Sequence, residues 1–133
     1  MLPTEAEWEY ACRGETMTPI AGTGKLDDMG WHTGNSGGTT HPVGQKTSNR
    51  FGLQDLQGNV WEWCEDVYDE GFYRKPDARE RDPISRAGSA YRAVRGGCWN
   101  NVATECRASN RGGPPPVDRG AGLGLRPACY PIP

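Results

Sequence analysis

The chain has 133 residues, of which 35% are hydrophobic, and it contains 19 glycines and 11 prolines. This length corresponds to one domain, and the composition is typical of a loop-rich fold with a modest core rather than a bundle of long helices. The net charge of −2 argues against generic attraction to nucleic acid or to anionic lipid.

The sequence does not identify a cellular compartment. No apolar stretch is long enough to span a bilayer, and the N-terminus lacks the charged-then-apolar layout of a signal peptide. The mature form could still derive from an exported precursor. Both the cytoplasm and display at a host or cell surface therefore stay open.

Charge is distributed unevenly along the chain. Residues 1–70 carry 12 acidic and 4 basic side chains, whereas residues 71–133 carry 5 and 11. Two halves of opposite charge can pack against each other within one domain. The alternative is a basic face that binds an acidic ligand; the arginines among residues 107–126 allow either reading, and we expect them to form structural ion pairs.

The first predicted element is a helix that starts near the N-terminal end of the chain. Thr4 and Glu7 have the spacing of a capping box, in which each side chain bonds the backbone of the other residue. We expect the helix to continue through Cys12, to direct Trp8 into the core and to end near Gly14. A helix this close to the first residue predicts a domain that is either minimal or truncated at its N-terminus.

Two long segments are predicted to be irregular. Residues 14–50 are rich in turn signals, and we expect Trp31 and the Pro42-Val43 pair to anchor them in the core. Residues 65–90 are charged and form a surface excursion.

Short antiparallel strands complete the predicted fold. Residues 60–63 follow the turn dipeptide Gly58-Asn59 and should place Trp61 and Trp63 on one face of a strand. Further strands are predicted at 92–99, ending in a Gly-Gly bend, at 106–111 and at 123–127. The fold class is therefore α+β, with one or two helices and more than half of the chain in loops.

One turn carries a candidate metal site. Asp55 and Glu62 flank the turn and could close on one hard cation, with the backbone carbonyls of Gly58 and Val60 supplying further oxygens. The alternative is a corner anchored by tryptophan, in which both acids are merely solvated.

The cysteines do not form a recognisable metal or redox motif. Cys12, Cys64, Cys98, Cys106 and Cys129 are unevenly spaced and include no Cys-x-x-Cys pair. The two histidines lie far from paired cysteines, so a zinc site is not supported. We expect buried reduced thiols, with at most one or two disulfides if the chain is exported.

Seven ordered segments resemble a known family. They are Leu2-Pro-Thr-Glu-Ala-Glu-Trp-Glu-Tyr-Ala11, Asn35-Ser-Gly-Gly, His41-Pro-Val-Gly, Phe51-Gly-Leu…Gly58-Asn-Val-Trp-Glu-Trp63, Arg95-Gly-Gly-Cys-Trp-Asn100, Cys106-Arg…Arg111 and Leu123-Gly-Leu-Arg126. Together they resemble the sulfatase-modifying factor family, also called formylglycine-generating enzyme-like, which is a branch of the C-type lectin-like fold. The resemblance implies a single domain of that fold over residues 1–133.

The resemblance does not by itself define the function. Members of the family include an oxidase that converts a sulfatase cysteine to formylglycine, domains of thiol-metabolism enzymes, kinase-linked modules, and variable ligand-binding proteins of diversity-generating retroelements. Because one fold supports all of these, the residues of the site must separate them.

The oxidase pattern is not matched. That enzyme binds copper(I) with two cysteines that have four residues between them and lie beyond the aromatic residue that follows the Gly-Gly bend. Here Cys98 precedes Trp99, Asn101 occupies the position of the first catalytic cysteine, and Cys106 fits a non-catalytic strand better than the second. We therefore expect no catalytic residues and no oxidase activity.

The resemblance also implies a calcium ion. Family members bind calcium with side chains at the positions of Asp55 and Glu62 and with carbonyls at the positions of Gly58 and Val60. All four positions are retained here. We expect a structural calcium that fixes this turn.

Residues 99–126 resemble the mutated cassette of retroelement-diversified proteins. Scaffold residues of that cassette are matched at Trp99, Cys106, Arg107, Arg111, Pro116, Arg119, Leu123, Gly124 and Arg126. Between 102 and 122, each residue at a variable position can be reached from an asparagine codon by changing adenines only, except Glu105. Cys98 and Leu125 also depart from the usual pattern, which has serine and phenylalanine there.

This segment is the predicted ligand-binding region. Its candidate contact residues are Trp99, Asn100, Asn101, Val102, Thr104, Glu105, Asn110, Gly112, Gly113, Pro114, Pro115, Val117, Asp118, Gly120, Ala121 and Gly122. Solvated loops on a rigid scaffold tolerate side-chain replacement, as in antibody paratopes. We therefore expect non-catalytic binding of an unidentified protein or surface ligand, with an undiversified accessory or binding module of the same family as the alternative.

Overall fold

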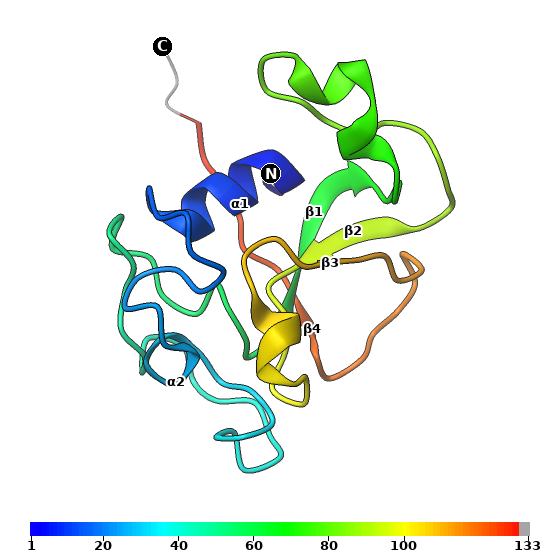
Figure 1. The fold of residues 1–133 in the computed structure, drawn as a ribbon. Helices are drawn as coiled ribbons and strands as arrows, with labels where there is room; N and C mark the ends of the chain where they lie inside the picture. The colour runs from blue at the N-terminus through cyan, green and yellow to red at the C-terminus, as the bar shows by residue number, and fades with distance from the viewer. Residues whose placement is uncertain (131–133) are drawn as a thin grey trace.

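The computed structural model describes residues 1–130 and confirms the α+β class (Figure 1). Its elements are α1 (Glu5–Arg13), α2 (Leu26–Met29), β1 (Trp61–Val67), the 3-10 turns η1 (Phe72–Arg74) and η2 (Pro76–Arg79), β2 (Arg92–Arg95), the 3-10 turn η3 (Ala103–Cys106), β3 (Arg111–Gly112) and β4 (Leu123–Gly124). Long loops connect these short elements. Within the described residues, no helix combines the length and the hydrophobicity that a membrane crossing requires.

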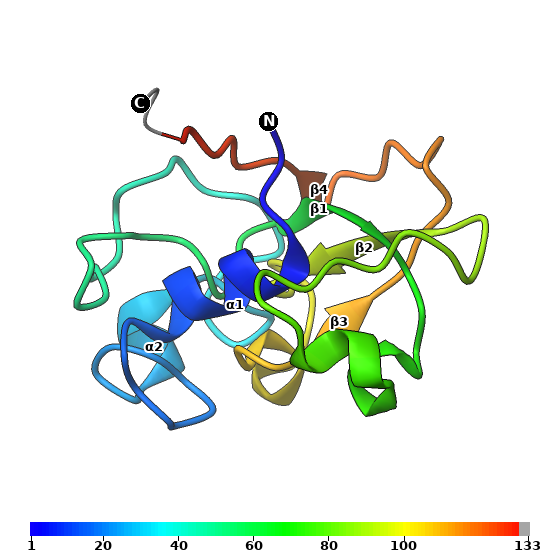
Figure 2. The same cartoon turned by 90° about the horizontal axis from the view of Figure 1, so that it is seen from above.

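Helix α1 forms as its sequence predicts. The Thr4 hydroxyl accepts a hydrogen bond from the Glu7 amide at 3.2 Å, and the Glu7 carboxylate accepts one from the Thr4 amide at 2.8 Å. Gly14 ends the helix in the left-handed conformation, with φ of 52°, which glycine adopts at little cost. Trp8 and Cys12 are buried, and the helix packs across β1 and β2 (Figure 2).

The sheet has the strand order β3-β2-β1-β4. β1 pairs with β2, and β2 with β3, in antiparallel register. β4 instead pairs with β1 in parallel, with Trp61 opposite Leu123, so the expectation of antiparallel strands alone is corrected to a mixed sheet.

Two of the expected strands are much shorter than predicted. The segment 106–111 contributes only Arg111 to β3, because residue 106 ends the turn η3 and residues 107–109 form a bend and a turn. The segment 123–127 contributes only β4, and Pro127 has no amide hydrogen with which to extend a strand ladder.

β1 confirms the predicted alternation and buries carboxylates. Its side chains alternate between buried and half-buried, so Trp61 and Trp63 share the outer face. The buried Asp66 accepts hydrogen bonds from the Glu5 amide at 2.8 Å and the Ser85 amide at 2.9 Å. Burial raises the pKa of Asp66 above its usual value, although these two hydrogen bonds act in the opposite direction.

The loop over residues 14–50 is anchored differently from the prediction. Pro42 and Val43 are exposed, Val43 to 80%, so that part of the expectation was wrong. Buried Asn49 anchors the loop instead, because its amide group donates to the carbonyls of Ala11 at 2.6 Å and Cys12 at 3.1 Å. A polar side chain is suited to this place because loop backbone groups need partners that no strand supplies.

Candidate ligand-binding face

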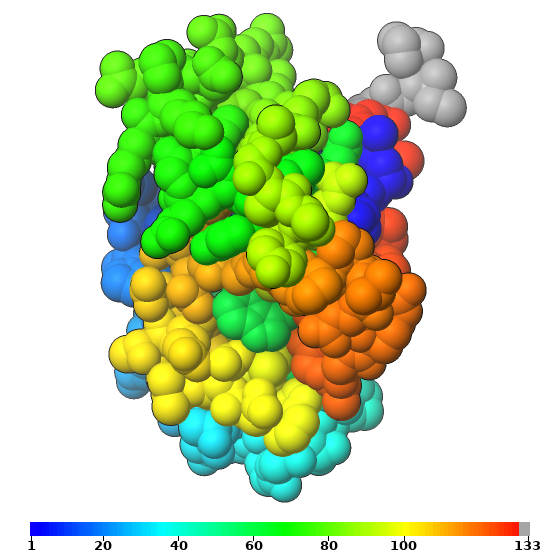
Figure 3. Space-filling view, turned by 90° about the vertical axis from the view of Figure 1, so that its right-hand side faces the viewer, coloured from blue at the N-terminus to red at the C-terminus, as the bar shows by residue number. Residues whose placement is uncertain are grey.

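The predicted binding segment lies at the surface. Residues 99–106, in yellow, and 111–122, in orange, lie next to each other on one face of the molecule (Figure 3). None of the sixteen candidate contact residues is buried. Val117 is 78% exposed and Val102 is 52% exposed, which places apolar side chains on both parts of this face.

The glycines of the segment are not equivalent to its other positions. A Cβ atom on Gly113 would lie 2.4 Å from the Tyr68 ring, and one on Gly112 would lie 2.8 Å from Val94 Cγ2. A Cβ atom on Gly122 would lie 3.0 Å from Cys98 Sγ. These positions face the scaffold, so a side chain there would first have to displace a neighbour.

Outward positions form the part of the segment that is available to a ligand. Their side chains are exposed: Val102, Thr104, Glu105, Pro115, Val117, Asp118 and Ala121. The sequence pattern did not separate these from the inward glycines, because the pattern of codons carries no information about packing.

The N-terminal end of the segment is held by the loop before β1. The Ser36 hydroxyl donates to the Trp99 carbonyl at 2.8 Å. The Asn101 side chain closes a turn, since its Oδ1 accepts from the Cys98 amide at 2.9 Å and its Nδ2 donates to Glu105 at 2.6 Å. Trp99 and Asn101 are half-buried and thus shape the face more than they extend from it.

Trp63 is part of this face and was not among the predicted contact residues. It lies between a hollow of about 410 Å³, which Arg92 and Pro116 also line, and one of about 350 Å³, which Asp118 and Leu125 also line. The alternation of β1 was the available signal, because it turns Trp63 outward. A fixed tryptophan supplies an aromatic side chain that the segment 100–122 itself lacks.

The predicted metal position contains one unpartnered carboxylate oxygen. Asp55 is 5% exposed, and its Oδ2 accepts from the Gly44 amide at 2.7 Å, while its buried Oδ1 has no hydrogen-bond partner. Asp55, Val60 and Glu62 all border one cavity of about 400 Å³. An unpaired buried anionic oxygen fits a hard cation, because a cation would satisfy it.

Glu62 is already engaged by other groups. Its carboxylate accepts from the Arg126 guanidinium at 2.9 to 3.2 Å and from Trp8 Nε1 at 2.7 Å. Among residues 1–130, no cluster of three or more His, Cys, Asp or Glu side chains surrounds a common point. A cation here would therefore share Glu62 with Arg126 and would depend on carbonyl oxygens, including those predicted at Gly58 and Val60.

The four buried thiols are not activated as nucleophiles. All five cysteines are free, and four of them are buried. Burial raises the pKa of Cys12 and of Cys106 to about 12, and it raises the pKa of Cys64 and Cys98 as well. Reactive thiols have a lowered pKa instead, because the thiolate is the nucleophile.

Iodoacetamide at about neutral pH is expected to modify only Cys129 in the folded protein, because Cys129 is the exposed cysteine of the described chain. Mass spectrometry should find one modified thiol under native conditions and five in urea. The variant Cys129→Ser is the matched control and should stay unmodified until it unfolds. Rapid native modification of Cys98 or Cys106 would contradict the assignment of both as structural thiols.

Comparison with known proteins places this geometry in a family. Residues 1–130 match the family described as sulfatase-modifying factor enzyme 1-like domain. The serine/threonine-protein kinase pkn1 of Chlamydia caviae is 39% identical over 111 residues, which are 83% of this chain and 18% of that protein. The formylglycine-generating enzyme of Mus musculus is 32% identical over an alignment of 153 positions, gaps included, that covers 99% of this chain and 40% of that enzyme.

Solved structures share the fold. Treponema denticola variable protein 1 superposes with a TM-score of 0.83 at 36% identity, over 94% of this chain and 45% of that protein. PvdO from Pseudomonas aeruginosa superposes with a TM-score of 0.78 at 28% identity, over 94% of this chain and 50% of PvdO. These matches confirm the predicted C-type lectin-like α+β fold, and the chain spans half or less of the length of each of these relatives.

Proposed function

Because this chain belongs to the sulfatase-modifying factor enzyme 1-like family, and because oxidase chemistry has no matching cysteine pair here, we propose that it is a non-catalytic ligand-binding domain. It displays side chains between residues 99 and 122 on a C-type lectin-like scaffold, as variable proteins of diversity-generating retroelements do.

One observation carries this proposal. The candidate contact residues are all exposed or half-buried, whereas Cys106 and Ala108, which lie among them in the sequence, are 0% exposed. The segment thus separates scaffold positions from display positions along its length. The similarity to Treponema denticola variable protein 1 supports the same division of roles.

Sequencing the locus from several isolates of one population tests the proposal. We expect substitutions to concentrate at the outward positions between Asn101 and Gly122, at adenines of an adjacent template repeat. Variation that is absent, or scattered over the whole chain, would reject diversification. The domain would then be an undiversified accessory or binding module, a role that agrees with the match to 18% of a larger kinase.

Copper binding tests the remaining enzymatic reading. An oxidase activity has to be tested as well, because this chain is 32% identical to the formylglycine-generating enzyme of Mus musculus. We expect no stoichiometric copper(I) binding by this chain. Binding that is lost in both Cys98→Ser and Cys106→Ser would support the oxidase instead.

We also propose a structural calcium ion at Asp55 and Glu62, with the carbonyls of Gly58 and Val60 as further ligands. The unpartnered Oδ1 of Asp55 supports this proposal. The ion would supply positive charge to a buried carboxylate and fix the turn that leads into β1. It has no role in bond-making chemistry here.

Calcium is expected to raise the melting temperature of the wild-type protein relative to chelator, because a ligand that binds only the folded state stabilises it, by about 2.7 kcal/mol at a hundredfold excess over Kd. Asp55→Asn should abolish the shift while leaving the Arg126–Glu62 pair in place. Asp77→Asn, at an exposed aspartate, is the matched control and should keep the shift. An equal shift in Asp55→Asn would place any bound calcium elsewhere.

A further inference from the structure

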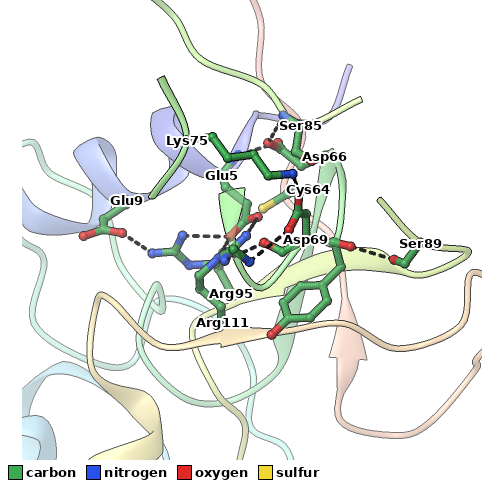
Figure 4. Close-up of polar contacts among 12 residues, drawn as sticks. Glu5, Glu9, Cys64, Asp66, Asp69, Lys75, Ser85, Ser89, Arg95 and Arg111 are labelled. Atoms are coloured by element: carbon green, nitrogen blue, oxygen red, sulfur yellow. Dashed lines mark hydrogen bonds and ion pairs between the residues drawn. The ribbon is translucent and has the colours of Figure 1, made fainter. Parts of the chain in front are cut away.

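The part of the display region between Arg111 and Arg126, residues 112–125, is called the display segment below, and it starts directly after an ion pair with a buried carboxylate. Arg111 donates to both carboxylate oxygens of Glu5, at 2.7 and 2.6 Å, and to the Asp69 carbonyl at 3.0 Å (Figure 4). Its guanidinium carbon also lies 5.1 Å from the centre of the Tyr68 ring and 4.8 Å from that of the Tyr73 ring. Glu5 belongs to α1 and is 0% exposed, so the residue before Gly112 is held by the scaffold from several directions.

A second ion pair holds the other end of the segment. Arg126 donates through Nε and Nη2 to both oxygens of Glu62, at 3.0 and 2.9 Å, and through Nη2 to the Gln54 carbonyl at 2.8 Å. Glu62 lies on β1 and is 4% exposed. Trp8 Nε1 bonds the same carboxylate at 2.7 Å, which fixes its orientation.

Between these two pairs, and just before the first of them, the scaffold binds main-chain carbonyls. The Cys106 carbonyl accepts from Gln57 Nε2 at 2.7 Å, and the Ala108 carbonyl accepts from Arg95 Nη2 at 2.7 Å. The Pro114 carbonyl accepts from the Arg92 amide at 3.1 Å, and the Gly122 carbonyl accepts from the Trp61 amide at 2.7 Å. Every residue type offers a backbone carbonyl. These hydrogen bonds therefore survive exchange of the side chains on the segment.

We infer that Arg111 and Arg126 are positioning residues that clamp the ends of the display segment, so that the path of its main chain does not depend on the side chains between them. The inference rests on the proposed function for its purpose, since a display segment must tolerate replacement. Arginine suits this task because its planar fork binds a carboxylate through two hydrogen bonds, which fixes direction as well as distance.

The clamp predicts a specific form of non-additivity. The variant Val117→Ser/Ala121→Ser/Leu125→Ser changes three exposed side chains between the two arginines, and it should hardly shift the urea midpoint of the wild-type protein. Arg126→Lys keeps the charge but loses the fork, and it should lower the midpoint. In the variant that combines these changes, we expect the urea midpoint to fall by clearly more than the sum of the two separate decreases. The reason is that the unclamped segment then depends on its own side chains.

The matched control is Arg107→Lys, at an exposed arginine just before the segment, whose side chain bonds only the Thr104 carbonyl among the described residues. Its combination with the triple variant should be additive. Additive behaviour in the Arg126→Lys background would overturn the clamp and leave Arg126 as a contributor to global stability alone.

If Arg126→Lys does not fold, amide hydrogen exchange in the triple variant alone tests the clamp. In the otherwise wild-type protein, the triple variant should leave exchange at the Trp61 and Arg92 amides unchanged, because these amides bind the Gly122 and Pro114 carbonyls. Faster exchange at both amides would contradict the clamp. Neither measurement uses a ligand, so a population without variation at the locus would reject the proposed function and leave the result on the clamp standing.

Discussion

Glu5→Gln is expected to be among the most destabilising substitutions in this chain, lowering the free energy of unfolding by about 3–5 kcal/mol. Glu5 is 0% exposed and accepts hydrogen bonds from two arginines, Arg95 at 3.1 Å and Arg111 at 2.6 and 2.7 Å. Glutamine keeps the shape but removes the negative charge. Two guanidinium groups would then be left inside the protein without their shared anion.

Urea unfolding at neutral pH, followed by tryptophan fluorescence, measures this effect. Glu15→Gln is the matched control, because Glu15 pairs with Arg50 at 3.1 Å while both side chains are more than half exposed. Exposed pairs of this kind contribute about 0–1 kcal/mol. A loss of less than about 1 kcal/mol for Glu5→Gln would mean that Glu9 and solvent compensate for the missing charge.

The sequence predicted structural ion pairs for the arginines among residues 107–126, and this is confirmed for Arg111 and Arg126. The prediction was wrong for Arg107 and Arg119, which bond only main-chain carbonyls within residues 1–130. The acidic partners were not predicted. Glu5 and Glu62 come from the acidic half, and Arg95, Arg111 and Arg126 from the basic half. Glu5 and Arg111 are 106 residues apart in the chain. Only the packing of α1 against the sheet brings them together, and no local pattern encodes that packing.

Local signals were reliable at two places in the chain. The capping box at Thr4 and the alternation along β1 both depend on residues a few positions apart, and both were predicted. The parallel pairing of β4 with β1 was not predicted, because it depends on how a long loop returns to the sheet. Val43 was assigned to the core on hydrophobicity alone, while the loop in fact uses the polar Asn49.

The candidate site was predicted as a stretch of sequence, not as a surface. The family resemblance indicated residues 99–126 as the candidate segment, and the structure adds that Gly112 and Gly113 face the scaffold. It also adds Trp63, which reaches this face from β1 and precedes the residues of the segment 99–126 by 36 to 63 positions. A ligand surface assembled from separate elements cannot be read from one continuous motif.

Gly58→Ala is expected to lower the free energy of unfolding by at least about 3 kcal/mol, because strain and overpacking act at the same residue. The backbone φ of Gly58 is +86°, a conformation that alanine rarely adopts. A Cβ atom would also lie 2.3 Å from the Trp31 carbonyl oxygen and 2.9 Å from the Trp31 amide nitrogen. These contacts are with backbone, so no side-chain rotation relieves them.

Gly52→Ala separates the two causes. Gly52 has a similar φ of +77°, but nothing lies within 4 Å of its added Cβ atom. It should therefore show the backbone strain alone, about 1 kcal/mol. Both variants are best measured in chelator, since the Gly58 carbonyl is a proposed calcium ligand. Equal losses would show that the turn moves away from Trp31 at little cost, and the Asn59 amide, which donates to the Trp31 carbonyl at 2.8 Å, would then lose its protection from hydrogen exchange.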